Sequence, residues 1–257
     1  MLIVLSPAKT LDESPAATPH PPTQPALLGE AEKLVRTARN LSLKKLRALM
    51  DISESLAKTN RDRFQAFETP LTPENALPAG WMFRGDVYRG LDIDTFTPDD
   101  LAFAQEHLAI LSGLYGILRP LDLVKPYRLE MGSALKTRRG NNLYAFWGDR
   151  ITKQIRAMTA EHDDPVLVNL ASQEYFRAVK VPKLNQRVVT PVFRENRKGK
   201  EITVSFTAKR SRGVMARWIV QNRFTSPERL AEFSLMGYVF QEDRSTDDTL
   251  LFVRPGP

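Results

Sequence analysis

The sequence contains no cysteine and only three histidines among its 257 residues. The missing cysteine excludes disulfide frameworks, thiolate zinc sites, cysteine-ligated iron–sulfur clusters and a cysteine nucleophile, and it fits a reducing compartment. The histidines, His20, His107 and His162, lie far apart in the chain. A histidine-rich metal centre is therefore not expected, and we predict neither a bound metal nor a cofactor.

Long apolar runs are also missing. The longest, residues 108–118, is interrupted by a serine and two glycines and is far shorter than the roughly 20 residues of a membrane helix. The apolar start of the chain, Leu2–Leu5, has no basic leader and ends before Pro7, too early for the apolar core of a signal peptide, which spans about 7–15 residues. We therefore expect a cytoplasmic protein with no membrane partner.

Positive charge is abundant but uneven. The net charge is +7 with a pI near 9.7, yet residues 1–100 hold 12 basic and 14 acidic side chains, so residues 101–257 carry a net +9. The excess concentrates in residues 119–156, with 9 basic against 3 acidic side chains, and in residues 194–217, with 8 against 2. Such clusters favour a polyanionic partner, although basic surfaces also occur on proteins that bind none.

The hydrophobic pattern predicts an α+β fold with a mixed sheet and hairpins, in a single domain over residues 1–257. The continuous apolar run Leu2–Leu5 predicts a strand buried on both faces. Leucines at helical spacing over residues 26–67 predict two or three helices with a break at 40–42, and a capping signal at residues 97–100 predicts another helix. Further strands are expected at residues 166–170, 188–193, 202–206, 239–240 and 249–253, with a turn at 196–200.

Gly113 and Gly116 are candidates for a phosphate-binding turn. They lie between two apolar segments that we interpret as helices, an arrangement similar to a helix-hairpin-helix unit, in which glycines let backbone N–H groups approach a phosphate. A glycine pair at this spacing also occurs in the clamp loop of KH domains. The alternative is structural, because a glycine can cap a helix and allow tight packing.

Three groups of cations are candidates for phosphate contacts. A loop after the first strand presents Lys9 three residues after Ser6; this S-x-x-K spacing also occurs in serine acylases, but their S-D-N and K-T-G elements are absent from the sequence. The second group, Arg119, Lys125 and Arg128, is held in extended backbone by two prolines. The third group, Lys209, Arg210 and Arg212, lies at a predicted helix start. The predicted DNA-binding cations are Lys9, Arg119, Lys125, Arg128, Lys209, Arg210 and Arg212.

Two carboxylates are candidates for catalysis. Glu130 and Glu174 lie in mixed polar and apolar sequence and could act as general acids or bases if one cleft brings them together. The acidic group at residues 161–164 contains metal-ligating residue types, but it precedes a proline and a predicted strand, which is more typical of a solvated turn.

Several motifs together resemble the bacterial YaaA family of peroxide-stress-resistance proteins. The resemblance implies resistance to hydrogen peroxide, lower intracellular free iron and, from one family member, binding of double-stranded DNA. It also implies an unusual α+β fold with a positively charged cleft and a helix-hairpin-helix element, in which Gly113 and Gly116 would form the hairpin. The cations that the resemblance places in the cleft are Arg119, Lys125, Arg128, Lys209, Arg210 and Arg212. The motifs are Ser6–Asp12, Gly85–Leu91, Leu111–Asp122, Pro126–Gly132, Phe146–Gly148, Asn169–Ser172 with Glu174–Phe176, and Ala208–Gly213.

These observations favour a DNA-binding protein of the peroxide response that binds duplex or structured DNA with little sequence preference. Two other classes stay open. One is an enzyme that acts on nucleic acid or a nucleotide through Glu130 or Glu174, and the other is an iron-handling protein with oxygen ligands. The position of the carboxylates discriminates between them, because a cleft lined only by cations favours binding, whereas clustered acids favour an enzyme.

Overall fold

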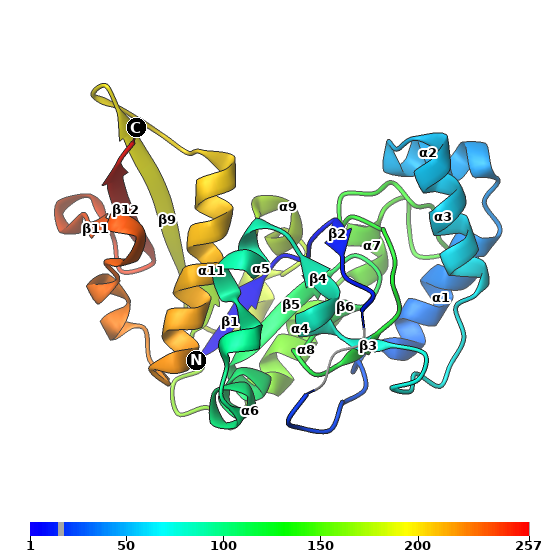
Figure 1. The fold of residues 1–257 in the computed structure, drawn as a ribbon, viewed down its shortest axis with the longest axis horizontal. Helices are drawn as coiled ribbons and strands as arrows, with labels where there is room; N and C mark the ends of the chain where they lie inside the picture. Colours follow the sequence, from blue (N-terminus) through cyan, green and yellow to red (C-terminus); the bar gives the residue numbers. More distant parts are fainter. Residues whose placement is uncertain (15–17, 257) are drawn as a thin grey trace.

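The central sheet of the computed structural model is built around the first strand of the chain (Figure 1); the structure describes residues 1–14 and 18–256. Strand β1 (Leu2–Leu5) is buried at all four residues, as its continuous apolar run predicts. It lies between β5 (Leu108–Ser112) and β8 (Leu167–Asn169) and runs parallel to both. The predicted strand with both faces covered is confirmed.

The sheet continues from β8 to β9 (Val188–Arg197) and β12 (Thr249–Pro255), which are also parallel, in the order β11-β12-β9-β8-β1-β5-β6. Antiparallel strands form its margins: β6 (Gly116–Leu118), β11 (Val239–Phe240) and β10 (Lys200–Ile202), which pairs with β9. Two small antiparallel pairs stand apart, β2 (Thr10–Leu11) with β4 (Phe83–Arg84) and β3 (Leu77–Pro78) with β7 (Leu123–Val124). The mixed sheet, the hairpins and the helices confirm the α+β class.

Helices lie around this sheet, and α1, α2 and α3 form a group at the end of the molecule opposite the end that holds β9 and β12 (Figure 1). The helices are α1 (Leu28–Arg39), α2 (Leu43–Met50), α3 (Glu54–Gln65), α4 (Ala79–Met82), α5 (Asp86–Leu91), α6 (Pro98–His107), α7 (Leu143–Trp147), α8 (Arg150–Met158), α9 (Gln173–Phe176), α10 (Val181–Leu184) and α11 (Ser205–Gln221), with short 3₁₀ turns at Ile93–Thr95, Glu228–Glu232, Leu235–Gly237 and Glu242–Arg244.

Local capping signals explain why several predicted helices are confirmed. The break between α1 and α2 falls at residues 40–42, and Ser42 caps α2 by accepting a hydrogen bond from the Lys45 amide. Thr97 and Asp100 form a reciprocal capping box at the start of α6, where Pro98 occupies the first turn.

The helices predicted on either side of Gly113 and Gly116 are wrong, because both flanking segments are strands of a β-hairpin. The apolar run Leu108–Leu111 fits a buried strand as well as a helix, and pairing with β1 decides the outcome. Both glycines are buried. A Cβ at Gly113 would lie 2.0 Å from the Leu129 carbonyl oxygen, and Gly116 (φ +77°) lies against the Trp147 ring. Their role is close packing, and we place no phosphate contact there.

The predicted strand over residues 202–206 ends at Ile202, and α11 begins at Ser205. Lys209, Arg210 and Arg212 therefore lie inside α11 rather than at its start. Gly213 brings this helix against α5, since a Cβ there would lie 1.8 Å from the Val87 carbonyl oxygen.

One hydrophobic cluster extends from Met1 to Phe252 and includes residues of the sheet and of most helices. Among the helices that the structure describes, none is both long and apolar enough to cross a membrane.

Candidate functional site

A cavity of about 390 Å³ lies at the carboxyl ends of β1 and β8. From β1 the sheet extends to β5 on one side, whereas from β8 it extends to β9 on the other. Chain segments that leave two neighbouring parallel strands in opposite directions open a crevice at this point, which is where open sheets commonly bind ligands. Ser6 directly follows β1, Ser172 follows β8 by three residues, and both line the cavity.

The two serines hold the floor of the cavity together. The Ser172 backbone N–H donates to Ser6 Oγ at 2.8 Å, and Ser6 Oγ donates to Ser172 Oγ at 3.2 Å. The Tyr88 hydroxyl donates to the Ser6 carbonyl oxygen at 3.0 Å. Lys9 Nζ lies instead 3.8 Å from Glu130 Oε1, so the S-x-x-K spacing does not produce a serine–lysine pair within the described residues.

Glu130 and Glu174 both line this cavity, although 44 positions separate them in the sequence. Arg128 Nε donates to Glu130 Oε1 at 2.9 Å, and the Gly132 backbone N–H donates to Glu174 Oε1 at 2.9 Å. Burial raises the pKa of the Tyr175 phenol beside them, and the negative charges of both carboxylates raise it further. The structure thus brings the two candidate acids into one site.

Helix α11 contributes cations to the same cavity. Lys209 and Arg212, three residues apart and therefore on one helix face, line it together with Lys9. Within residues 1–14 and 18–256, neither Lys209 nor Arg212 makes a side-chain hydrogen bond or ion pair. Burial lowers the pKa of the half-buried Arg212 guanidinium. Arg210 is exposed and does not line the cavity.

The remaining predicted cations lie elsewhere. Lys125 is only 9% exposed, and its Nζ lies 3.4 Å from Glu68 Oε1. Arg119 is half-buried beside Asp122 and lines neither this cavity nor the one described next. Arg128 is held by Glu130, behind the cavity wall. The cations predicted from the sequence therefore do not form one cluster, and only Lys9, Lys209 and Arg212 line the same cavity.

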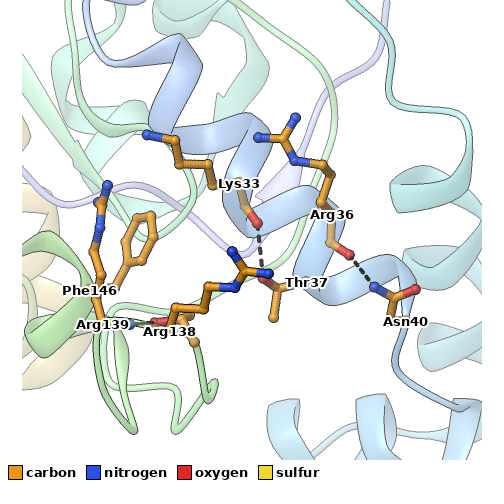
Figure 2. Close-up of a pocket in the computed structure, with 8 residues that line it drawn as sticks. Lys33, Arg36, Thr37, Asn40, Arg138, Arg139 and Phe146 are labelled. Atoms are coloured by element: carbon orange, nitrogen blue, oxygen red, sulfur yellow. Dashed lines mark hydrogen bonds between the residues drawn. The ribbon is translucent and has the colours of Figure 1, made fainter.

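A second cavity, of about 520 Å³, lies between α1 and the turn at residues 137–139 (Figure 2). Lys33 and Arg36 project into it from α1, and Arg138 extends across it toward the helix (Figure 2). Arg139 lies at its edge with the guanidinium carbon 4.9 Å from the centre of the Phe146 ring. No carboxylate is among the described residues that line it. Sequence reasoning missed Lys33 and Arg36, whose only signal is their spacing of three along one helix.

The Glu30 carboxylate binds two of the cations that line this second cavity. Lys33 Nζ donates to Glu30 Oε1 at 2.7 Å, Arg139 donates to both carboxylate oxygens, and Arg150 Nε lies 3.8 Å away. The hydrogen bond from Arg139 is the main cause that lowers the pKa of Glu30 to about 2. Arg36 and Arg138 have no ion-pair partner among the described residues, so their charge is available to a ligand.

A pair of short helices adjoins this cavity. Asn40, at the end of α1, lines the cavity, and α2 begins three residues later. The turn between α2 and α3 consists of Asp51 in the left-handed region (φ 48°), Ile52 and Ser53, whose hydroxyl accepts from the Leu56 amide. This tight helical hairpin occupies a different part of the chain from the one predicted at residues 113–116.

Residues 1–244 match the family model described as peroxide stress protein YaaA. The match covers most of the 257 residues, so the chain belongs to this family.

Proposed function

We propose that this member of the peroxide stress protein YaaA family binds double-stranded or structured DNA through its phosphates, with little preference for base sequence, during the response to hydrogen peroxide. The observation that carries the proposal is the second cavity, in which Lys33, Arg36, Arg138 and Arg139 face one space that no described carboxylate lines. A site lined only by cations favours binding over acid–base chemistry. The family supports the stress role, while the DNA partner and a cytoplasmic location are part of the proposal.

The cations of this cavity suit a phosphate backbone. Glu30 neutralises about one of the four charges and holds Lys33 and Arg139 in place, which lowers the entropy lost when they bind. Arg36 and Arg138 keep free guanidinium groups, whose planar donors match phosphate oxygens. Contacts of this kind give affinity without reading bases.

The α2–α3 hairpin extends the proposed DNA surface. Its first helix, α2, begins three residues after Asn40, which lines the cationic cavity, and its turn, Asp51–Ser53, lies at the far end of α2. We assign to this hairpin the helix-hairpin-helix role that the family resemblance implies. Left-handed backbone at Asp51 lets two helices meet at a tight turn. Of the sequence-predicted contacts, half-buried Arg119 remains as a secondary contact, whereas Lys125 and Arg128 are already paired with acids. Arg210 lies outside both cavities, and Lys9, Lys209 and Arg212 line the cavity at the ends of β1 and β8.

The test is the salt dependence of duplex DNA binding. In the double variant Arg36→Gln with Arg138→Gln, the slope of log affinity against log salt should flatten by about two, because each lost phosphate contact removes about one. A control with the same charge loss is Lys198→Gln with Lys200→Gln, at the exposed tip of the β9–β10 hairpin, which should leave the slope unchanged.

Two results would refute this interface. One is an unchanged slope in the Arg36 and Arg138 double variant when its thermal unfolding shows a folded protein. The other is a hundredfold or larger difference in affinity between unrelated duplexes at fixed salt, which approaches the roughly thousandfold gap of sequence-specific binders.

The lower free iron that the resemblance implies is a separate part of the proposal. Within residues 1–14 and 18–256, no group of three or more His, Asp or Glu side chains is placed to hold a metal ion. Anaerobic titration of the purified protein with Fe²⁺ tests whether the chain itself binds iron.

A further inference from the structure

We propose that the cavity at the ends of β1 and β8 binds a small phosphorylated sugar, free or as part of a nucleotide. Lys209 and Arg212 would hold the phosphate, and Glu130 and Glu174 would accept hydrogen bonds from the sugar hydroxyls. This site is separate from the proposed DNA surface and does not depend on it.

The cationic wall supplies the phosphate site. Arg212 is half-buried and has no partner among the described residues, and a guanidinium withdrawn from water without a partner costs free energy. A bound anion offsets that cost. The phosphate of a small ligand fits Arg212 because the guanidinium offers parallel donors to two oxygens, and Lys209, one turn away, adds a second charge.

The acidic wall argues against a polyanion in the same space. Glu130 Oε1 accepts a hydrogen bond from Arg128 and lies near Lys9 Nζ, and Glu174 Oε1 accepts one from the Gly132 N–H. The Oε2 atoms of both carboxylates have no partner within the described residues, so each can accept from a hydroxyl. Because two carboxylates repel a continuous phosphate chain but attract hydroxyl donors, the cavity fits a ligand with one anionic end and one hydroxyl-bearing end.

Size and position agree with this ligand class. The cavity volume of about 390 Å³ falls within the roughly 300–1,000 Å³ of small-molecule sites. The anionic end meets α11 and the hydroxyl end meets the segment at residues 130–132 and α9. Inorganic phosphate alone has no sugar hydroxyls to donate to the acidic wall.

Isothermal titration of the full chain with ribose 5-phosphate and AMP tests the proposal, with ribose and inorganic phosphate as the two halves of the ligand. We expect ribose 5-phosphate to bind at least about tenfold more tightly than either half, since each wall contributes charge-assisted hydrogen bonds. Arg212→Gln should weaken binding by about tenfold or more. Arg210→Gln, with the same charge loss two residues away on α11 but outside the cavity, should not change it.

A separate measurement tests the acidic wall formed by Glu130 and Glu174. Glu174→Gln should weaken ribose 5-phosphate by several-fold and leave inorganic phosphate equal or tighter, because it removes a repulsive charge. A 5′-phosphorylated oligonucleotide and its 5′-hydroxyl form distinguish a free ligand from a DNA end. The proposal is overturned if neither phosphorylated sugar binds at millimolar concentration, if Arg210→Gln and Arg212→Gln act alike, or if the 5′-phosphate tightens oligonucleotide binding and Arg212→Gln abolishes that gain.

Discussion

The carboxylate of Glu30 should carry a measurable share of the stability of the α1 end of the molecule. Its pKa falls from 4.5 to about 2, chiefly because Arg139 donates to it, and a change of this size corresponds to about 3 kcal/mol of native-state interaction. The side chain is 19% exposed, so we discount this value to about 2 kcal/mol for solvent screening. Glu30→Gln should therefore lower the melting temperature by about 4–8 °C at pH 7.

The pH dependence gives the sharper test. A carboxyl whose pKa is lower in the folded state stabilises the protein above its unfolded pKa and loses that contribution as pH falls through the folded value. The stability difference between the natural protein and Glu30→Gln should thus be full above about pH 5 and shrink toward pH 2. Urea unfolding at pH 7, 4 and 3 measures it, with exposed Glu161→Gln as a control expected to change stability by less than about 0.5 kcal/mol. A difference that stays constant from pH 7 to 3, or one no larger than the control's, would refute the reasoning.

Three further outcomes are expected. Gly213→Ala should destabilise the protein by about 3 kcal/mol or more, since its Cβ would lie 1.8 Å from a carbonyl oxygen. Gly29→Ala in α1, where a Cβ would meet nothing within 4 Å, should instead stabilise the protein by about 0.5–1 kcal/mol. Thermal unfolding of the two variants measures both effects. Burial lowers the pKa of His162 to about 4, so the folded state resists its protonation and stability should rise from pH 4 to 6.5, a rise that His162→Gln should reduce in urea titrations. Ser53→Ala, which removes the cap of α3, should cost about 1 kcal/mol; equal urea midpoints would contradict it.

The elements that the sequence predicts well are those with local signals. The capping box at Thr97 and Asp100 and the cap at Ser42 each stop or start a helix within one turn of chain. The segment before Gly113 has no such signal, because the short apolar run Leu108–Leu111 suits either structure until β1 pairs with it.

The candidate site shows a similar division. Residue types could be selected from the sequence, and Lys9, Glu130, Glu174, Lys209 and Arg212 do share one cavity. Their convergence follows from which strands neighbour β1, a long-range property that no local pattern encodes. The cationic cavity was missed because two of its residues lie in a helix that mixes acidic and basic side chains and two lie in a distant turn.

The central position of β1 has a consequence for how the chain acquires its structure. Its two neighbours in the sheet are β5, which ends at Ser112, and β8, which ends at Asn169. A growing chain therefore exposes both edges of this fully apolar strand until β5 has left the ribosome, and one edge until β8 has. Pairings this distant in sequence slow folding. The first strand to be synthesised therefore waits for its second partner while more than 150 residues are added, and the nascent protein needs shielding from aggregation at the segment that later forms the middle of its sheet.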